Sequence, residues 1–462
     1  MKYFFETYGC QMNIAESAAV EQLFLARGWE KSESAQVADI VIINTCSVRE
    51  TAENRIFGRL GWFAGLKAVR ACEPGAKHKS LEEAAEYVKD GPKPLTVVVM
   101  GCMAERLLNS LKKDYPCVDY VVGTYAKHHF GNIISAVEEN SQTEQLDDTE
   151  AYKFAPLSYE QGSFTAFVPI MHGCNNFCTY CIVPYVRGRE CSRPVDEILK
   201  EIDTLSSYGV REITLLGQNV NSYHGMNGDK ETNFAELLQI IANHLRDTNS
   251  SIGWVRFMSS HPKDLSDEVI NVISKEEVLC NHIHLPVQHG STRILKEMNR
   301  RYTRENYISL VEKIRKIIPN VSLTTDLMMG FPGETEEDVQ DTLELMKTVR
   351  YETAFMYYYN LRDGTPAAKM TNQVPVELKK ERLQRVIDLQ LEITSEEMKK
   401  RIGNVVKVLV ENVSRDNKDE LLGKTEQDER VAFAADKKLI GTFVSAKIDS
   451  LSGNTFRGTL LN

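Results

Sequence analysis

The sequence has no long hydrophobic run and no recognisable export signal. No stretch of about eighteen apolar residues occurs, so we expect no transmembrane helix. The N-terminus, MKYFFETYGCQMN, lacks the apolar core of a signal peptide and has an early Glu6. The 27 glycines and 14 prolines are scattered without a period, which excludes collagen-like and disordered chains. We therefore expect a cytoplasmic globular protein, whose 462 residues are enough for about two to four domains.

An excess of basic charge is missing as well. The 55 Lys and Arg residues face 65 Asp and Glu, and the net charge of −10 argues against a surface wholly coated with nucleic acid. This net charge does not exclude local basic patches. Ten cysteines are far too few for a disulfide scaffold of this length. Without an export signal the cysteines are expected to be reduced, as core thiols, metal ligands or catalytic groups. Their spacing along the chain distinguishes between these roles.

The first part of the chain alternates between strand-like and helix-like segments, which predicts an open parallel α/β sheet. An amphipathic helix is predicted over Ser17–Arg27, and the predicted strands are Lys2–Thr7, Asp39–Asn44, Thr96–Met100 and Tyr120–Val122. Cys72–Pro94 interrupts the alternation, and we interpret it as a surface insertion with one short helix. The acidic and polar segment Glu138–Glu150 has the composition of a linker.

The alternation resumes after this segment and continues to about residue 400. The predicted strands are Phe164–Met171, Glu212–Leu216, Trp254–Met258, His282–Val287, Val321–Met329 and Thr353–Tyr359. Pro194 and Pro375 are placed in the first turns of their helices, and the helix Pro375–Arg401 closes the region. Six such units predict a partial (β/α)6 barrel of the TIM type, with its chemistry at the C-terminal strand ends.

The last part of the chain changes to short β-branched strands, which predicts a small all-β barrel of a nucleic-acid-binding kind. The predicted strands are Val405–Val413, Glu420–Lys424, Arg430–Phe433, Gly441–Asp449 and Thr455–Leu461. This part has 12 Lys and Arg against 9 Asp and Glu, so it is locally basic. The predicted division is residues 1–140, a linker over 141–160, the barrel over 161–397 and the β-domain over 398–462.

The most specific motif is a CxxxCxxC run formed by Cys174, Cys178 and Cys181, just after the first predicted barrel strand. Three thiolates so close on a loop can hold three irons of a [4Fe–4S] cluster, which leaves the fourth iron open to chelate a small molecule. The alternatives are a structural zinc site or plain core thiols. However, no second CxxC pair follows at the spacing that zinc sites use.

Three further cysteines end successive strands of the first domain: Cys10 in TYGC, Cys46 in INTC and Cys102 in VMGC. The carboxyl ends of neighbouring parallel strands lie side by side, where such folds bind ligands, so we expect these cysteines to converge. Each alone would more often be a small buried residue. Three at corresponding strand ends favour a shared site.

Taken together, several motifs resemble the methylthiotransferases, a family of the radical S-adenosylmethionine (SAM) superfamily. They are TYGCQMN at 7–13, NTCSVRE at 44–50, GCMAER at 101–106 and GCNNFCTYCIVPYVRGRE at 173–190. The resemblance covers the chain except Cys72–Pro94 and implies that the β-domain is a TRAM domain. Residues 11–13 and 175–177 look most like the branch that acts on tRNA bearing N6-isopentenyladenosine beside the anticodon.

The resemblance implies two [4Fe–4S] clusters, an auxiliary one on Cys10, Cys46 and Cys102 and a radical SAM one on Cys174, Cys178 and Cys181. One SAM would donate the methyl group, and the other would yield the 5′-deoxyadenosyl radical that attacks carbon 2 of the adenine. The expected partners are the tRNA and a flavodoxin- or ferredoxin-like electron donor, with no membrane. Enzymes of the same chemistry that modify threonylcarbamoyl-adenosine or a ribosomal-protein aspartate are one alternative. A noncatalytic, metal-containing RNA-binding protein is another.

Other candidates lie near the predicted strand ends. Those that the resemblance implies bind SAM are Tyr180, Gly217, Gln218, Gln288, Asp326, Gly330 and Glu334. The alternative for the glycines is simple turn formation. Arginines expected to contact tRNA or the SAM carboxylate are Arg187, Arg189, Arg193, Arg300 and Arg301, with a solvated loop or helix face as the alternative. Tyr357–Tyr359 is interpreted as core packing, with stacking on adenine as the sharper hypothesis.

Overall fold

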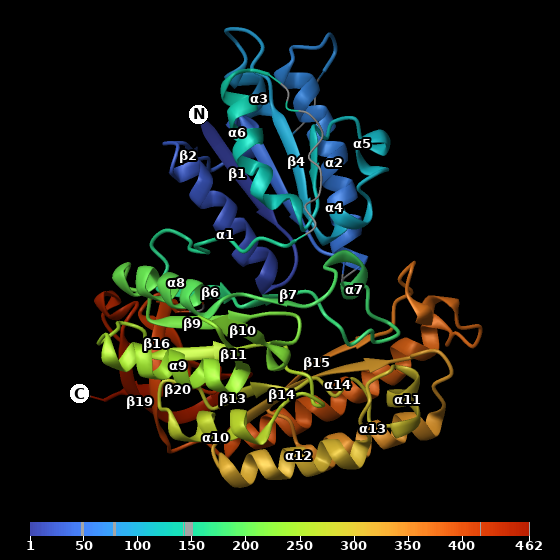
Figure 1. The fold of residues 1–462 in the computed structure, drawn as a ribbon, viewed down its shortest axis with the longest axis vertical. Helices are drawn as coiled ribbons and strands as arrows, with labels where there is room; N and C mark the ends of the chain where they lie inside the picture. Colours follow the sequence, from blue (N-terminus) through green and yellow to red (C-terminus); the bar gives the residue numbers. More distant parts are fainter. Residues whose placement is uncertain (48–49, 77–79, 142, 144–150, 416, 462) are drawn as a thin grey trace. The chain divides into compact units, whose positions relative to one another are not determined.

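The computed structural model describes residues 1–47, 50–76, 80–141, 143, 151–415 and 417–461 (Figure 1). It divides into two compact units, Met1–Asn175 with Ile182–Arg193, and Asn176–Cys181 with Pro194–Asn462. Val48 and Arg49 of the NTCSVRE motif lie outside the described residues, as do residues 142 and 144–150 of the predicted linker. Within the described ranges, no helix is long and apolar enough to cross a membrane.

The first unit contains a five-stranded parallel sheet of order β2-β1-β3-β4-β5, which confirms the predicted open α/β fold. Its strands are β1 (Lys2–Thr7), β2 (Glu30–Lys31), β3 (Ile40–Thr45), β4 (Thr96–Gly101) and β5 (Tyr120–Val122). Its helices are α1 (Gln11–Leu25), α2 (Glu50–Arg70), α3 (Glu82–Tyr87), α4 (Cys102–Arg106), α5 (Leu111–Asp114) and α6 (Phe130–Glu138), with 3-10 turns η1 (Ala35–Val37) and η2 (Ala126–His129).

Both faces of this sheet are covered by helices (Figure 1). Alternate residues of β3 pack on the two faces of the sheet, because successive side chains of a strand point in opposite directions. Val41 and Ile43 belong to the core under α2, whereas Ile40 and Ile42 belong to the core under α1 and α6. This two-sided burial explains why β3 is an almost continuous apolar run.

The helix predicted from Ser17 begins six residues earlier, at Gln11. Cys10 is its N-cap residue, and the backbone N–H of Cys10 donates to Oδ1 of Asn13 at 3.3 Å. An Asn in the first turn accepts such a bond as a capping device, and the apolar periodicity used for the prediction does not register it. The start of α1 therefore fixes the backbone at Cys10.

The first unit ends with short elements around the cysteine run. These are β6 (Thr165–Pro169), β7 (Met171–His172), α7 (Val183–Val186) and β8 (Cys191–Ser192), and β7 pairs with β8. The strand predicted over Phe164–Met171 is therefore interrupted at Ile170.

The second unit contains the βα repeats of the predicted partial barrel, which confirms the fold class. Its strands are β9 (Glu212–Leu216), β12 (Trp254–Phe257), β13 (His282–His284), β14 (Ser322–Met329) and β15 (Thr353–Tyr358), with parallel pairing of β9 with β12 and of β13, β14 and β15 in that order. The hairpin β10 (His224–Asn227) and β11 (Lys230–Asn233) was not predicted.

The helices of these repeats are α8 (Val195–Ser207), α9 (Phe234–Asp247), α10 (Asp267–Lys275), α11 (Thr292–Glu297), α12 (Arg304–Ile317), α13 (Glu336–Val349) and α14 (Val376–Lys399), with 3-10 turns η3 (Val220–Ser222) and η4 (Pro366–Lys369). The placement of Pro194 and Pro375 in a first turn was wrong by one residue, since both are N-cap residues. Strand β13 also ends early, because Pro286 has no N–H with which to continue the ladder.

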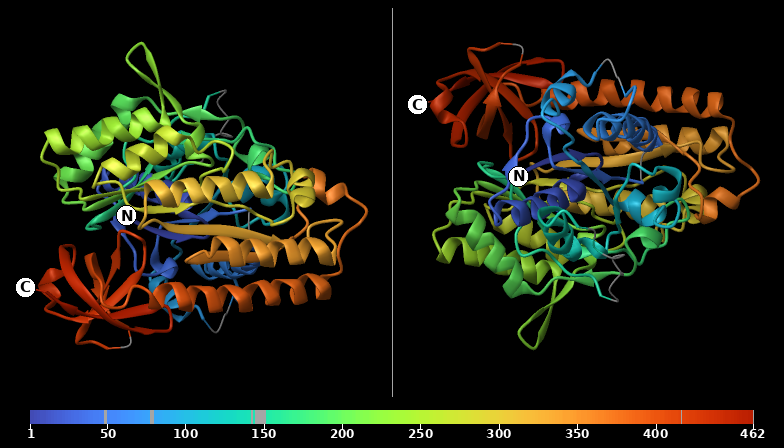
Figure 2. Two further views of the ribbon diagram at one scale, coloured as in Figure 1. Left: turned by 90° about the horizontal axis from the view of Figure 1, so that it is seen from below. Right: turned by 90° about the horizontal axis from the view of Figure 1, so that it is seen from above.

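The C-terminal part of the second unit is a closed barrel of order β16-β17-β18-β20-β19, as predicted. Its elements are β16 (Val405–Val413), β17 (Glu420–Thr425), β18 (Arg430–Ala434), η5 (Lys437–Leu439), β19 (Phe443–Ser452) and β20 (Thr455–Leu460). Helix α14 leads directly into this barrel, which is red in Figure 2. Val408, Phe433, Ile448 and Phe456 are among the buried residues that fill it.

The segment around the turn between β17 and β18 is bound to Arg256 of β12 and to Glu212, the first residue of β9. The Arg256 guanidinium, on β12, donates to the backbone oxygens of Thr425 and Glu426 at 2.7 Å each. It also pairs with Glu212 of β9 at 2.8 Å, and Lys424 pairs with the same carboxylate at 2.6 Å. Because Arg256 and Glu212 are buried, these contacts hold the small barrel against the base of the larger one.

Candidate functional site

Cys10, Cys46 and Cys102 lie together at the carboxyl ends of β1, β3 and β4. The register pairs Thr7 with Asn44 and Thr45 with Gly101, which brings the three following cysteines to one edge of the sheet. Cys46 and Cys102 are buried, and Cys10 is exposed. The structure therefore brings these three cysteines together as the strand order predicted.

Two glycines make this convergence possible. A Cβ on Gly9 would lie 2.7 Å from Cβ of Cys46, and a Cβ on Gly101 would lie 2.4 Å from the Thr45 carbonyl oxygen. Both residues have positive φ, 143° at Gly9 and 96° at Gly101, a region that favours glycine. The Gly-Cys pairs in TYGC and VMGC are thus required by the close packing of the strand ends.

The thiols of this site share an electrostatic environment. A hydrogen bond with Cys46 lowers the pKa of Cys10 to about 6, and the positive charge of Arg187 acts in the same direction. Burial raises the pKa of Cys102, and the charge of Arg187 opposes that rise. The Nε of Arg187 donates to Sγ of Cys102 at 3.2 Å. A cation at this position favours thiolates, the form that binds metal.

Arg187 is held by a buried network in the same unit. Its Nη1 donates to Glu16 at 2.8 Å and lies 3.5 Å from Nδ1 of His172, and Lys127 donates to the same Glu16 oxygen at 2.6 Å. Burial alone would raise the pKa of Glu16, but Arg187 and Lys127 outweigh it and lower that pKa to about 2. The ring of Tyr152 stacks on His172 with centroids 3.6 Å apart.

The CxxxCxxC run is divided between the two units, with Cys174 in the first and Cys178 and Cys181 in the second. The N–H of Cys174 donates to the Gly188 carbonyl at 3.1 Å. In the second unit, Nη1 of Arg300 donates to Sγ of Cys178 at 3.4 Å. The amide of Asn299 also donates to the Phe177 carbonyl at 3.0 Å, so the loop is anchored just after α11.

Three residues expected to bind SAM lie near Cys178 and Cys181. The N–H of Gln288 donates to the Asp326 carbonyl at 2.9 Å, and the Tyr357 hydroxyl donates to Oε1 of Gln288 at 3.2 Å. Burial raises the pKa of Tyr357 well above its ordinary value, and the charges of Asp326 and Cys181 add to the effect. Burial does the same for Tyr180, to which Cys178 and Cys181 contribute.

The backbone of Gln288 is unusual as well, because its φ of 73° is rare for a residue with a side chain. Residues held in such conformations cluster at functional sites. Tyr357 was predicted to pack in the core or to stack on adenine, and it was not among the residues expected to bind SAM. The available signal was its place in the Tyr357–Tyr359 run, where alternate side chains of β15 face opposite sides.

Glu334 and Gly330 belong to a different arrangement. The buried Glu334 carboxylate pairs with Arg382 at 2.9 Å and His289 at 3.1 Å, and it accepts the N–H of Gly330 at 2.7 Å. These contacts hold the loop after β14 in place, so the role of the Glu334 carboxylate is to position that loop. Gly217 and Gln218 follow β9, with Gly217 buried and Gln218 half-buried.

The arginines expected at a phosphate do not form one surface. Arg187, Arg193 and Arg300 are buried, and they donate to protein atoms, including the Pro169 carbonyl for Arg193 and the Pro286 carbonyl for Arg300. Burial of this kind does not support the expectation that these three contact a tRNA phosphate. Arg189 and Arg301 are exposed.

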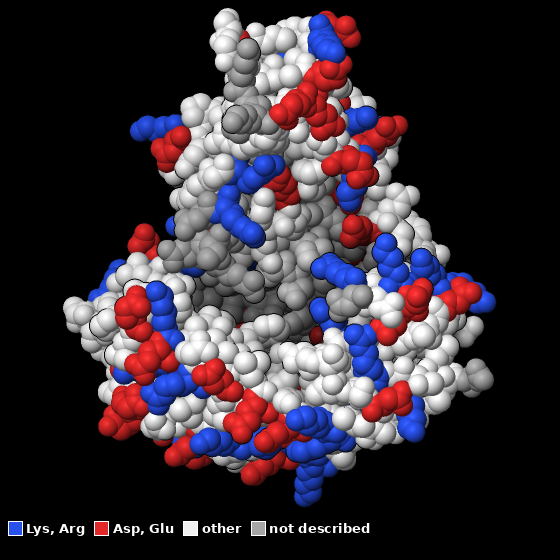
Figure 3. All heavy atoms as spheres, turned by 180° about the vertical axis from the view of Figure 1, so that it is seen from behind, with Lys and Arg blue, Asp and Glu red and all other residues white. Residues whose placement is uncertain are grey.

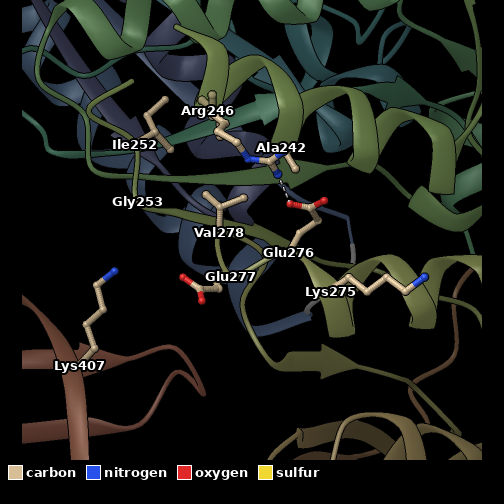
Figure 4. A pocket seen from close by; sticks show the side chains of 10 residues that line it. Ala242, Arg246, Ile252, Gly253, Lys275, Glu276, Glu277, Val278 and Lys407 are labelled. Carbon is tan, nitrogen blue, oxygen red and sulfur yellow. Dashed lines mark hydrogen bonds and ion pairs between the residues drawn. The ribbon is translucent and has the colours of Figure 1, made fainter. Parts of the chain in front are cut away.

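A groove of about 470 Å³ lies elsewhere in the second unit (Figure 4). It is lined by Arg246 and Ile252, by the segment Lys275–Val278 and by Lys407 of β16, and an Arg246–Glu276 ion pair crosses it. It adjoins Gly253, which precedes the first residue of β12. This groove is therefore at the base of the strands, whereas the candidate site follows their carboxyl ends.

The candidate ligands at both sites are cysteine thiols, which are the donors that hold [4Fe–4S] clusters. Among the described residues, no three His, Cys, Asp or Glu side chains converge closely enough to surround one metal ion. Cysteines that bind separate irons of a [4Fe–4S] cluster need not approach so closely. The N–H donors of Arg187 and Arg300 to cysteine sulfur are also the kind of contact that such clusters receive.

Three family models match the chain. The Radical SAM superfamily model matches residues 168–346, the model of the Uncharacterized protein family UPF0004 matches residues 2–123, and the TRAM domain model matches residues 399–461. The matched segments include the cysteine run, the three strand-end cysteines and the closed β-barrel, respectively. The fold and its cysteines thus define a radical SAM protein with an additional cysteine-bearing domain.

Curated relatives match the whole chain. A protein of Treponema denticola is 50% identical over 100% of both chains, and one of Treponema pallidum is 48% identical over 100% of this chain and 99% of its own. One of Clostridium botulinum is 43% identical over 98% and 95%. Each is called tRNA-2-methylthio-N(6)-dimethylallyladenosine synthase. The chain belongs to this family of radical SAM methylthiotransferases.

Solved structures share the fold at low sequence identity. The radical SAM methyltransferase TsrM of Kitasatospora setae, with tryptophan and a SAM analogue bound, has a TM-score of 0.56 at 14% identity, covering 79% of this chain and 75% of its own. The cobalamin-dependent radical enzyme OxsB has a TM-score of 0.50 at 11% identity, covering 84% and 56%. At these identities the likeness concerns the fold alone.

Proposed function

We propose that this chain is a tRNA methylthiotransferase that modifies carbon 2 of N6-isopentenyladenosine (also called N6-dimethylallyladenosine) beside the anticodon. The full-length relatives carry the name of this activity. The observation that carries the proposal is the convergence of Cys10, Cys46 and Cys102 beside Arg187. A radical SAM enzyme needs a single cysteine run for SAM cleavage, whereas sulfur insertion needs a second site, and these strand ends offer one.

The protein side chains have separate tasks in this proposal. Cys10, Cys46 and Cys102 hold the auxiliary cluster, and Cys174, Cys178 and Cys181 hold the radical SAM cluster. When bound, the clusters supply an electron for SAM cleavage and a point of attachment for the transferred sulfur. Tyr180 and Tyr357 shield the space near Cys178 and Cys181 from water. Gln288, fixed by Tyr357, and Asp326 offer polar groups to SAM there.

The partners follow from the same proposal. The domains divide at residues 1–140, 161–397 and 398–462, with a linker over 141–160, and the last of these binds tRNA. On the face shown in Figure 3, basic and acidic side chains are interspersed, so this face offers no broad basic surface to tRNA. A small flavodoxin- or ferredoxin-like protein delivers the electron.

Iron content tests the two-cluster arrangement. The protein reconstituted anaerobically should contain about eight irons and eight acid-labile sulfides, because each [4Fe–4S] cluster holds four of each. The triple variant Cys174→Ala/Cys178→Ala/Cys181→Ala should retain about four irons. Loss of all iron in that variant would show that the first domain holds no cluster, and the proposal would fail.

The substrate is tested separately, with one tRNA that carries the isopentenyl group and the same tRNA without it. Methylthiolation should depend on the isopentenyl group, because the relatives are named for that nucleoside. Mass spectrometry of the digested tRNA measures the product. Equal modification of both tRNAs would leave the chemistry in place but reject this substrate.

A further inference from the structure

We propose that Arg187 sets the reduction potential of the cluster held by Cys10, Cys46 and Cys102, as a positioning residue that supplies a buried charge and an N–H donor to the thiolates. The inference rests on the proposed function, which places a cluster at this site. It gives Arg187 a role unlike the phosphate contact predicted from the sequence.

The geometry places the guanidinium directly against Cys102. Nε of Arg187 lies 3.2 Å from Sγ of Cys102, and the Arg187 side chain is only 3% exposed. A buried charge acts across a low-dielectric interior, so its influence on nearby sulfur is larger than that of a surface arginine. The same segment follows the CxxxCxxC run by six residues, so one stretch of chain serves both cysteine sets.

The surrounding charges are arranged to leave one positive charge near the thiolates. Arg187 and Lys127 both contact Glu16, so two cations share one anion. A net cation beside a cluster favours the form with one more electron, because that form is the more negative.

A purely structural role does not account for the side chain. The backbone of this segment is held independently, because the Tyr125 hydroxyl donates to the Arg187 carbonyl at 3.0 Å and Thr124 Oγ1 donates to the Val186 carbonyl at 2.8 Å. Ile182 and Val186 also pack against Cys102. The backbone of this segment therefore has contacts that do not involve the guanidinium, whose Nε is directed at sulfur.

The test uses the triple variant Cys174→Ala/Cys178→Ala/Cys181→Ala, in which the only expected cluster is the auxiliary one. The midpoint potential is measured by a dithionite titration followed by electron paramagnetic resonance, a one-electron reduction in which no bond is broken. Arg187→Gln should shift the potential to a more negative value. Glu16→Gln, which removes the anion and keeps Arg187, should shift it to a more positive value.

The opposite signs are the discriminating result, because a general loosening of the site would not move the two variants in opposite directions. Arg187→Lys keeps the charge without the planar fork, and it should lie between the parent and Arg187→Gln. Arg300→Gln is the matched control, as another buried arginine whose sulfur partner, Cys178, belongs to the other set and is already replaced in this background, and it should leave the potential unchanged.

Failure of the inference and failure of the proposed function give different results. No iron in the triple variant would reject the auxiliary cluster and with it the proposed function. About four irons with one potential in the parent, Arg187→Gln and Glu16→Gln would overturn the inference alone. If Arg187→Gln does not fold, Glu16→Gln decides, since an unchanged or more negative potential in that variant also overturns it.

Discussion

Gly101 shows how a single atom can decide whether a cysteine reaches its site. A Cβ there would lie 2.4 Å from the Thr45 carbonyl oxygen, which is backbone and cannot yield easily. Gly101→Ala should therefore displace Cys102, destabilise the fold by roughly 1–3 kcal/mol and lower the iron content of the triple cysteine variant. Chemical unfolding and iron analysis measure the two effects.

Gly28→Ala is the matched control for that variant. Gly28 also has a positive φ, 73°, but a Cβ there would meet no atom within 4 Å. It should show the backbone cost without the loss of iron. Equal iron in Gly101→Ala and Gly28→Ala would contradict the view that crowding at Gly101 controls Cys102.

The residues of the candidate site differ in how far the sequence could predict them. The six cysteines stand out because each follows or lies near a buried strand, where neighbouring strands meet. Arg187 could not be assigned in the same way, since its partner Glu16 is 171 residues away in the chain. Which groups surround a charge depends on tertiary packing, and no local pattern records it.

At the scale of elements, Glu429 makes the joint of the small barrel sensitive to pH. Burial raises its pKa from 4.5 to about 7, although Arg401 lies 2.7 Å away and opposes the rise. The folded protein thus holds a proton that the unfolded chain releases near pH 4.5. The resulting stabilisation is complete below that pH and is lost as the pH rises through about 7.

Glu429→Gln should consequently gain stability relative to the parent at high pH. We expect the gain at about pH 8 to exceed that at about pH 5 by roughly 1–3 kcal/mol, measured by urea unfolding. Glu392→Gln, at an exposed position of α14, should show no such difference. A gain for Glu429→Gln that is equal at the two pH values would contradict the raised pKa.

Arg256 tests whether the β17–β18 turn is fixed to the strands beside it. Arg256→Met removes three hydrogen bonds and leaves the buried Glu212 paired with Lys424 alone. We expect a loss of about 3–5 kcal/mol in stability and faster proteolytic release of the small barrel. Arg430→Met, at an exposed position of β18, should be cleaved at the parent rate. Equal rates for both variants would mean that Arg256 does not hold the joint.

The type of each element, helix or strand, was predicted more accurately than the residues at which it begins and ends. The strands β9 and β16 have the predicted bounds, since alternation and turn residues define both ends. Helix α1 and strand β13 each differ from the prediction at one end. Asn13 caps the start of α1, and Pro286, two residues after the last residue of β13, prevents the strand from continuing. The β10–β11 hairpin escaped prediction because its strands, HGMN and KETN, have little hydrophobic alternation.

For the whole molecule, the net charge of −10 makes any tRNA contact depend on few basic residues. Lys437 and Lys438 form an exposed pair on η5 of the TRAM barrel. Lys437→Gln/Lys438→Gln should weaken tRNA binding and reduce the slope of log affinity against log salt by about 0.7–0.9 for each lost phosphate contact. The rate at saturating tRNA should not change.

The matched control is Lys112→Gln/Lys113→Gln, an exposed lysine pair on α5 of the first unit. Fluorescence anisotropy over a series of salt concentrations compares the two variants with the parent. A slope that falls only in the α5 variant would show that the tRNA contacts the first unit and not η5.

The bond between Arg256 and the β17–β18 turn has a consequence for which tRNAs can be modified. With that joint fixed, the reach from the small barrel to the loop that bears Cys178 and Cys181 has one length. If the small barrel binds the tRNA as proposed, this fixed length selects the base that lies at that distance from the bound part of the tRNA. Lengthening the anticodon stem by one base pair would then move the target adenine out of the position in which it can be modified, even though the adenine itself is unchanged.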